Sequence, residues 1–375
     1  MHPEWPMAKS RQEGFSPIFT ITPEIAMGLM RVEAVRQAIV DLPITPRVLA
    51  NLRESARLLS THYSTTIEGN RLTREQVAGV IGESRHVPGR ERDRDEVKGY
   101  YAALDEVERL AKLPRAVDEA SVMRLHALVM GRGKKRVRPS PYRDGQNVIR
   151  DSGSNAMVYL PPEAKDVPSL MGQLMEWLNR EDGLPPPLKA AIAHYQFATI
   201  HPYYDGNGRT ARLLTTLILH RGGYGLKGLY SLEEYYARGL KEYYAALTLG
   251  PSHNYYLGRA ETDISQWVAY FVAGMADAFE KVRAQARHAA AMGGKDRAVL
   301  LRTLDARQRR ALTLFQESRE IAARQIAELF GLKPRGAALV CQHWVAAGFL
   351  EVTNPSKKSR RYKLGDAYEA IVELY

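Results

Sequence analysis

Apolar residues recur every three or four positions along most of this chain, which is the spacing of one face of an α-helix. Between residues 91 and 110 the apolar stripe consists of Val97, Tyr101, Leu104 and Val107, and acidic and basic residues alternate around it. The same spacing predicts further helices at 25–39, 45–59, 76–81, 118–130, 167–178, 188–200 and 213–219. We therefore expect a mainly α fold.

Two regions depart from the helical pattern. Short β-like runs at 143–150 and 158–160 flank a Gly/Ser/Asn turn at 153–155, which predicts a β-hairpin. Near the C-terminus, helices are expected at 307–316, 319–330 and 334–347, with strands at 348–352 and 360–364. An Ala/Gly-rich stretch at 284–295 precedes this part and is expected to be a helix end and linker, so the C-terminal part is expected to be a separate module.

Length and composition limit the class of protein. A chain of 375 residues is long enough for two or three domains. Cys341 is the only cysteine, which excludes an intramolecular disulfide and a cysteine metal cluster and fits a reducing compartment. We find no run of 18 apolar residues and no signal-peptide pattern, so we expect a cytoplasmic protein without a membrane partner. The net charge of +11 favours anionic partners without identifying one.

The chemistry is concentrated in the segment 201–212, His-Pro-Tyr-Tyr-Asp-Gly-Asn-Gly-Arg-Thr-Ala-Arg. It separates two predicted helices, so Gly206 and Gly208 open the N-terminus of the second, where free N–H groups and the helix dipole favour an anion. Arg209 and Arg212 lie three residues apart on one helix face, and two guanidinium groups there repel each other unless an anion joins them.

Two further side chains in this segment suggest what the anion is. A carboxylate beside phosphates is expected to hold a hard cation such as Mg²⁺, which assigns Asp205 as a metal ligand. His201 can take a proton near neutral pH and is the candidate base. The segment is not a Walker A loop, because no Gly-Lys-Ser/Thr follows the glycines. Together these residues predict a site for attack on a nucleotide phosphate.

The segment 201–212 resembles the signature of Fic-domain proteins, His-Pro-Phe-x-Asp/Glu-Gly-Asn-Gly-Arg-x-x-Arg, with Tyr203 in place of Phe. Most of that family transfer AMP from ATP to a protein hydroxyl, which is called AMPylation. The resemblance implies that His201 deprotonates the target hydroxyl and that Asp205 binds Mg²⁺. It also implies that Gly206, Asn207 and Gly208 form an anion hole, to which Asn207 adds its side chain, and that Arg209 and Arg212 bind the β- and γ-phosphates.

A second motif, Ser64-Thr-Thr-Ile-Glu68-Gly-Asn70, resembles the inhibitory helix of the same family. Glu68 lies near a predicted helix end, where Gly69 and Asn70 stop the helix. Paired with Arg212, its carboxylate would occupy the arginine that the γ-phosphate needs. We therefore expect Glu68 and Ser64 to hold basal activity down, although the same carboxylate could instead position a water for AMP removal.

The resemblance also implies roles for the hairpin and for a later helix. The hairpin resembles the flap on which a target peptide docks by strand addition, which points to Val158 and Tyr159. A helix after the signature closes the adenine pocket in the family, often with an Asn-Arg pair, but this chain has Ala237-Arg238-Gly239 there. Tyrosines at 235–236 and 243–244 are expected in a core or an interface. The nucleotide preference therefore stays open.

The C-terminal module resembles a winged helix, with Gly331 in the turn of a helix-turn-helix. Lys357, Lys358, Arg360 and Arg361 lie at its predicted hairpin and suit phosphate contacts. The predicted recognition helix, with Lys333, Arg335, Gln342 and His343 among apolar residues, is poor in groups for base readout. The sequence leaves DNA binding and protein contact equally open, and a homodimer is a further option.

The sequence thus predicts three parts. Residues 1–115 form an N-terminal helical region with the inhibitory helix at about 55–70, residues 116–285 a Fic-type catalytic core with a β-hairpin flap, and residues 296–375 a winged helix. The expected function is transfer of AMP from Mg-ATP to a Ser, Thr or Tyr hydroxyl. The alternatives are AMP removal by the same site, another nucleotide donor, or a DNA-binding regulator with a nucleotide-sensing domain.

Overall fold

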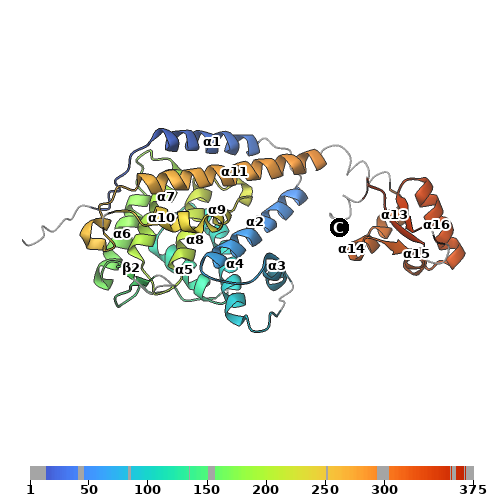
Figure 1. Ribbon diagram of the computed structural model, residues 1–375, viewed down its shortest axis with the longest axis horizontal. Coiled ribbons are helices and arrows are strands. Elements are labelled where there is room, and N and C mark those ends of the chain that lie inside the picture. Colours follow the sequence, from blue (N-terminus) through green and yellow to red (C-terminus); the bar gives the residue numbers. More distant parts are fainter. Residues whose placement is uncertain are drawn as a thin grey trace, which may run out of the picture. The chain divides into compact units, whose positions relative to one another are not determined.

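The computed structural model describes residues 14–40, 46–82, 86–134, 136–150, 157–250, 252–293, 304–354, 356, 360–366 and 368. The chain divides into two compact units, Met1–Arg287 and His288–Tyr375. Most of the described residues are helical, which confirms the expected mainly α fold (Figure 1). None of the described helices is long and apolar enough to cross a membrane.

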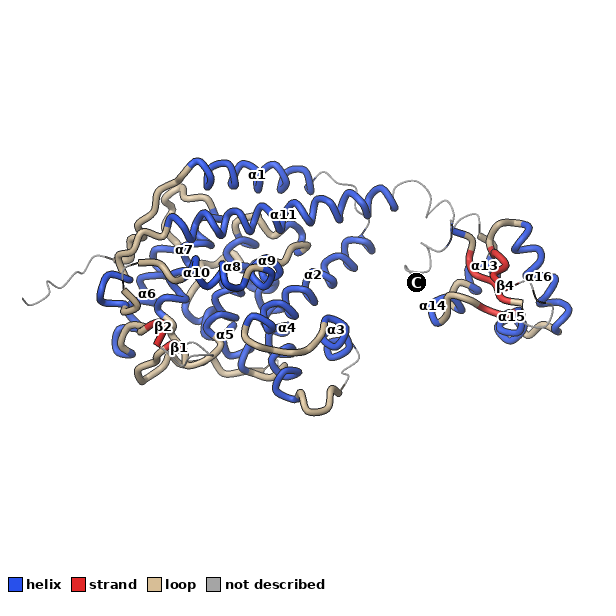
Figure 2. The backbone as a smooth tube through the Cα atoms, in the orientation of Figure 1, coloured by secondary structure: helices blue, strands red, loops and turns tan. Residues whose placement is uncertain are grey.

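The first unit is a helical bundle with one small hairpin (Figure 2). Its α-helices are α1 (Pro23–Val40), α2 (Pro46–Ile67), α3 (Arg74–Gly82), α4 (Glu91–Ala111), α5 (Glu119–Met130), α6 (Val167–Leu178), α7 (Pro186–Ile200), α8 (Asn207–Arg221), α9 (Leu232–Arg238), α10 (Leu240–Leu247) and α11 (Ser265–Gly293). Three short turns of other helix types are η1 (Ala164–Asp166), η2 (Leu226–Gly228) and η3 (Tyr255–Arg259). The strands β1 (Ile149–Arg150) and β2 (Met157–Tyr159) pair antiparallel.

Helix α7 lies at the centre of this unit and packs against α6 and α8, and α8 packs in turn on α4 and α5. Nearly every side chain of α7 is buried, which explains why this segment is apolar on all faces instead of amphipathic. One of its buried polar side chains, His194, lies between the hydroxyl groups of Thr215 (2.9 Å) and Tyr243 (3.0 Å). The two helices that flank the predicted catalytic segment are therefore fixed by the core.

Local caps fix the starts of two helices. Asp118 caps α5 by accepting the N–H of Ser121 at 2.8 Å, and Thr73 and Gln76 form a capping box ahead of α3. One assignment on α4 was wrong. Tyr101 is half-exposed and donates to Glu54 at 2.8 Å, whereas Tyr100 is the buried tyrosine of the stripe. A polar hydroxyl can be buried there because Tyr100 donates to Glu233 at 2.9 Å.

Helix α2 joins the N-terminal region to the rest of the unit. It begins close to the predicted start and extends well past residue 59, to Ile67. It packs on α4 and α9, and Ser60 donates to the buried carboxylate of Glu233 on α9 at 3.0 Å. Because Tyr100 of α4 donates to the same carboxylate, this side chain ties α2, α4 and α9 together. The end of α2 is thereby held in a defined place.

The second unit contains α13 (Ala306–Ala311), α14 (Leu314–Glu317), β3 (Ile321–Ala322), α15 (Ala323–Phe330), α16 (Pro334–Ala346), β4 (Leu350–Asn354) and β5 (Arg361–Leu364). The strands form an antiparallel sheet in the order β3-β5-β4, and Cys341 and Trp344 lie in the core beneath it. The helix predicted at 319–330 begins later, at Ala323, because Ile321 and Ala322 pair with β5. Lys357 and Lys358 lie outside the described residues.

The predicted turn of the hairpin at 153–155 lies outside the described residues. The stretch predicted as a helix end and linker, 284–295, is described only up to Gly293, and to that point it belongs to helix α11. The helix predicted at 307–316 is divided, because α13 ends at Ala311 and α14 begins at Leu314.

Candidate functional site

The predicted catalytic segment is the tight connection between α7 and α8. His201 ends α7 in the left-handed conformation, with φ 52°, and its N–H still donates to the carbonyl of Phe197 at 3.0 Å. Gly206 precedes α8 with φ 76°. A Cβ at Gly206 would lie 3.1 Å from Met130 Sδ and 3.2 Å from His126 Nε2, so both the backbone angle and the space favour glycine.

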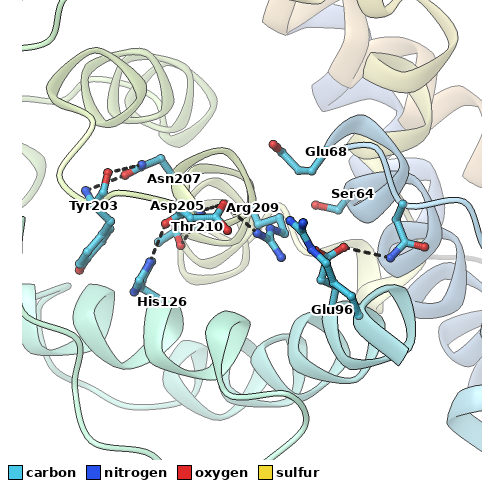
Figure 3. A network of polar contacts seen from close by, with 12 residues as sticks. Ser64, Glu68, Glu96, His126, Tyr203, Asp205, Asn207, Arg209 and Thr210 are labelled. Carbon is cyan, nitrogen blue, oxygen red and sulfur yellow. Dashed lines mark hydrogen bonds and ion pairs between the residues drawn. The ribbon is translucent and has the colours of Figure 1, made fainter. Parts of the chain in front are cut away.

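Two buried side chains hold this connection in shape. Asn207 accepts the N–H of Tyr203 at 2.9 Å and donates to the carbonyl of the same residue at 2.7 Å (Figure 3). His126 of α5 stacks on the Tyr203 ring at 3.6 Å and donates from Nε2 to the Asp205 carbonyl at 2.9 Å. The Asn207 side chain was expected to line an anion hole, but its amide is hydrogen-bonded to the backbone of Tyr203 in the same loop. The groups available to an anion are therefore the backbone N–H groups at the start of α8.

Arg143 supports the other side of the connection. Its buried side chain donates from Nε to the His201 carbonyl and from Nη1 to the Gly145 carbonyl, both at 3.0 Å. The backbone N–H of Arg143 donates to the Pro202 carbonyl at 2.9 Å. Burial lowers the pKa of Arg143 without removing its charge. Neither Arg143 nor His126 was identified from the sequence, because both act through contacts between segments far apart in the chain.

The His201 side chain is set up to accept a proton. Nδ1 donates to the carbonyl of Ala198 at 3.3 Å, and this bond leaves Nε2 as the acceptor. Burial lowers the pKa of His201 to about 4. The imidazole is therefore neutral at pH 7 and able to act as a general base.

The first two turns of α8 carry the two arginines. Arg209 donates from Nη2 to Asp205 Oδ1 at 3.1 Å, and the same oxygen accepts the Gly206 N–H at 2.6 Å. The Arg209 side chain is only 3% exposed, whereas that of Asp205 is 56% exposed. Arg209 Nε and Arg212 Nη1 are buried without a hydrogen-bond partner in the described part of the chain. Unpaired buried donors beside a helix N-terminus fit an anionic ligand.

The end of α2 brings the second motif to Arg212. Arg212 donates from Nε to Ser64 Oγ at 2.8 Å, and its Nη2 donates to the Ser64 carbonyl at 2.9 Å and to Glu68 Oε1 at 2.8 Å. The arginine is 1% exposed and the glutamate 31% exposed. Burial works against its charge, but the Glu68 carboxylate raises the pKa of Arg212 above the ordinary value. The pairing expected from the sequence is thus present.

The carboxylate of Glu68 also lies against the first turn of α8. A Cβ added to Gly208 would overlap Glu68 Oε1 and would lie 3.2 Å from Arg212 Nη1. Gly69, with φ 90°, ends the segment, and Asn70 fixes it to α4 by donating to the Asp93 carbonyl at 2.8 Å. A negative charge therefore already occupies the space in front of the N-terminus of α8.

Asp205 is the only carboxylate that the sequence assigned to a metal. The described residues contain no cluster of three or more His, Cys, Asp or Glu that could hold an ion by themselves. Mg²⁺ in nucleotide sites is usually bound by one or two carboxylates together with the substrate phosphates. An exposed carboxylate next to the anion site fits that arrangement, so the donor set is compatible with a cation that arrives with a nucleotide.

The hairpin lies beside the same site. Tyr159 is 7% exposed and donates to the carbonyl of Thr199 at 2.8 Å, two residues before His201. Its side chain points into the core and cannot contact a docked peptide, so only the backbone of this residue is available for strand addition. Val158 is half-buried, and Met157 is 52% exposed.

The tyrosine-rich region after α8 divides between core and surface. Tyr236 and Tyr243 are buried and stack at 4.6 Å, as expected for core residues. Tyr244 is 46% exposed, and its hydroxyl donates to the Ile67 carbonyl at 3.3 Å, at the end of α2. This part of the bundle therefore contacts the end of α2, next to Glu68.

Comparison with known proteins supports the family resemblance over part of the chain. Residues 116–219 match the model of the Fic/DOC family, which covers α5 to most of α8 and includes the connection 201–206. The chain is 32% identical over 182 residues to the protein adenylyltransferase fic-1 of Caenorhabditis elegans and 30% identical over 181 residues to that of Caenorhabditis briggsae. Each alignment covers 47% of this chain but 34% of the relative, so the chain spans about a third of the length of these curated relatives.

Solved structures extend the likeness to the fold. A Fic family protein from Desulfovibrio desulfuricans G20 has a TM-score of 0.65 and 25% sequence identity, with 94% of this chain and 99% of that chain covered. Residues 134–508 of Fic-1 from C. elegans have a TM-score of 0.57 and 25% identity, with 72% of this chain and 74% of that chain covered. The fold is therefore similar to those of solved Fic proteins.

Proposed function

We propose that this chain transfers AMP from ATP to a hydroxyl side chain of a protein and that Glu68 keeps this activity low. The observation that carries the proposal is the placement of a neutral imidazole, a helix N-terminus and two buried arginines around one anion site. The curated relatives named as protein adenylyltransferases support the same reaction class.

The proposed reaction follows from these groups. Nε2 of His201 takes the proton of the target hydroxyl, whose oxygen attacks the α-phosphorus of ATP. The bond from the α-phosphorus to the bridging oxygen breaks, and pyrophosphate leaves. The N–H groups at the start of α8 and the guanidinium of Arg209 stabilise the negative charge that develops on the phosphates. Mg²⁺, held by Asp205 and the phosphates, would add further charge stabilisation.

The proposed inhibition follows from the Glu68 carboxylate. It accepts a hydrogen bond from Nη2 of Arg212 and lies against Gly208, where the γ-phosphate is expected. ATP that binds beside this carboxylate would have its phosphates displaced, and a displacement of about 1 Å can lower the rate ~100-fold. Ser64 contributes because its side chain and carbonyl hold Arg212 in place for Glu68.

The test is transfer of label from α-labelled ATP with Mg²⁺ to proteins of a whole-cell lysate and to the chain itself. Wild type is compared with Glu68→Gly, with Glu68→Gly/His201→Ala, and with Glu261→Gly as a matched control at an exposed glutamate. We expect strong labelling by Glu68→Gly alone. Equal labelling by wild type and Glu68→Gly would overturn the inhibitory role, and labelling by the double variant would overturn His201 as the base.

The same experiment addresses AMP removal. The Glu68 side chain is partly exposed, as a group that orients a water must be. Protein labelled by Glu68→Gly is purified and incubated with wild type and with Glu68→Gln. Release of labelled AMP by wild type only would show that the carboxylate serves the reverse reaction.

We further propose that the second unit is a winged helix, with α15 and α16 as the helix-turn-helix and β4 and β5 as the wing. Gly331, with φ 63°, forms the turn between the helices. On α16, Leu339 is 65% exposed, with Gln342 and His343 also exposed nearby. Because an exposed leucine suits contact with another protein better than contact with DNA, we favour a protein-contact role for this unit. Duplex DNA binding by the full chain that weakens steeply with salt would favour the regulator instead.

A further inference from the structure

A strongly basic loop lies next to the proposed catalytic site and has no part in the chemistry described above. It follows α5 and spans residues 131–138. Arg132, Lys134, Arg136 and Arg138 are exposed, and Lys135 lies outside the described residues. No acidic residue occurs between Gly131 and Arg143 in the sequence. None of the four exposed side chains forms an ion pair with another described residue.

Both ends of this loop are attached to the catalytic connection. Met130, the last residue of α5, lies against Gly206, since a Cβ at that glycine would be 3.1 Å from Sδ. At the other end, Arg143 donates to the carbonyl groups of His201 and Pro202. The loop therefore leaves and rejoins the bundle on two sides of the connection that carries the base.

Contacts within the loop limit how far it can move from this place. Ser140 donates its N–H to the Met123 carbonyl at 3.2 Å, which folds the returning chain along α5. Gly133, with φ 82°, packs on α4, because a Cβ there would lie 2.8 Å from Lys98 Cβ. Lys98 is half-buried and adds a fifth described cation beside the loop. The loop is thus held against α4 and α5, between two attachments to the catalytic connection.

The lack of counter-charges distinguishes this loop from the other basic surfaces of the unit. On α4, Arg90 pairs with Asp93, Arg92 with Glu96, and Arg109 with Glu106. In the loop, four described cations occur within seven residues, and like charges so near in the chain repel one another where salt screening is incomplete. An acidic partner relieves that repulsion and is attracted over a longer range than a neutral one.

We infer that loop 131–138 recognises an acidic surface segment of the target protein and brings its hydroxyl side chain to His201. This inference rests on the proposed function. A protein partner is favoured over a nucleic acid because the chain runs from this loop through Arg143 directly into β1 of the hairpin, the element that suits a docked peptide strand. The charged contacts lie outside the reacting groups, so they affect target affinity and leave the transfer step unchanged.

The experiment uses two synthetic peptides with the same central Ser, one flanked by Glu and one flanked by Gln. The full-length Glu68→Gly variant is compared with two triple variants in that background. One is Arg132→Ser/Lys134→Ser/Arg136→Ser. The matched control is Lys112→Ser/Lys227→Ser/Arg287→Ser, which removes three exposed cations elsewhere on the same unit. Transfer kinetics are measured at 50 and 200 mM salt, and binding of each fluorescent peptide is measured by anisotropy.

We expect the acidic peptide to have a KM at least about tenfold lower than the neutral one, with a similar kcat. The loop variant loses this preference, the control variant keeps it, and high salt reduces it. The KM for ATP is unchanged in both triple variants. A rise in the KM for ATP in the loop variant, with no change for peptide, would assign the loop to the nucleotide and overturn the inference.

The binding measurement tests the role of the loop independently of the proposed transfer reaction. If no variant transfers label to any substrate, the proposed function fails, and the anisotropy result still decides about the loop. Tighter binding of the acidic peptide that only the loop variant loses supports the inference. Equal binding by the loop and control variants overturns it, as does loop-dependent binding of duplex DNA without loop-dependent binding of the acidic peptide.

Discussion

The carboxylate of Glu68 lies so close to Gly208 that a Cβ at that glycine would overlap Oε1. The same oxygen accepts a hydrogen bond from Arg212 at 2.8 Å. A side chain from the end of α2 therefore places a negative charge where the N-terminus of α8 attracts anions. The close approach of the two residues requires a glycine at 208 and gives a direct way to test the arrangement.

Gly208→Ala should have opposite effects on stability in two backgrounds. In the wild type the new methyl group displaces Glu68, and we expect a loss of about 1–2 kcal/mol in the free energy of unfolding. In Glu68→Gly the overlap with Oε1 is gone, and a small shift of the end of the Arg212 side chain relieves the remaining 3.2 Å approach to Nη1. Alanine in the first turn of the helix should then be neutral or stabilising by up to ~1 kcal/mol. Urea unfolding of the four proteins in a double-mutant cycle measures the difference. Equal effects in both backgrounds would contradict the contact.

Ser64→Ala should destabilise the protein by about 1–3 kcal/mol, because it leaves Nε of the buried Arg212 without its acceptor. It should also raise basal transfer, since Arg212 is held less firmly for Glu68. Thr66→Ala on the same helix is the control, because Thr66 is exposed and bonds only within its own helix. Thermal unfolding and label transfer are measured on both variants, and similar losses in stability would refute the role of Ser64.

The pH dependence of the transfer rate should differ from that of an enzyme whose base is a solvent-exposed histidine. The pKa of His201 is lowered to about 4 by burial, so the base stays unprotonated as the pH falls through 6.5. For Glu68→Gly we expect a single-turnover rate that is level from pH 8 to about 5 and declines as the pH approaches 4. Stopped assays across this range test the prediction. A midpoint near 6.5 would mean that His201 is solvated as a free side chain is.

Arg143→Ala should impair transfer through the position of His201. Without this side chain, the His201 and Gly145 carbonyl groups lose a donor, and a misplaced base can lower kcat by ~100-fold. The KM for ATP should change less than about twofold, because Arg143 contacts no group of the anion site. Arg143→Lys should recover part of the rate. Arg115→Ala, at an exposed arginine, controls for the loss of one positive charge. A KM effect as large as the kcat effect would refute a positioning role.

Much of the site could be predicted because its reactive groups are contiguous in the chain. Spacing alone placed Arg209 and Arg212 on one face of a helix and the glycines at its start. The caps formed by Asp118 and Thr73 are equally local. Such features depend on neighbours within one helical turn, and those neighbours are visible in the sequence.

The parts that were missed depend on tertiary contacts. His126 stands among apolar residues of α5, and only the packing of α5 on α8 shows that it supports Asp205. Asn207 carries the same amide whether it binds a ligand or its own loop, so its bonds to Tyr203 could not be anticipated. The helical stripe of α4 fits Tyr100 as well as Tyr101, and only the packing of the helices shows that Tyr100 is the buried one. Strand β3 is two residues long, too short to give an alternating signal.

The bond between Glu68 and Arg212 joins two segments of one chain that are 144 residues apart in sequence. Its effective concentration is therefore fixed by the fold and does not fall when the protein is diluted. Under the proposed inhibition, ATP would compete with this carboxylate, and relief would require movement of the end of α2, where Asn70 is bound to α4 and Ser60 to Glu233. Control of that kind would be built into each folded chain.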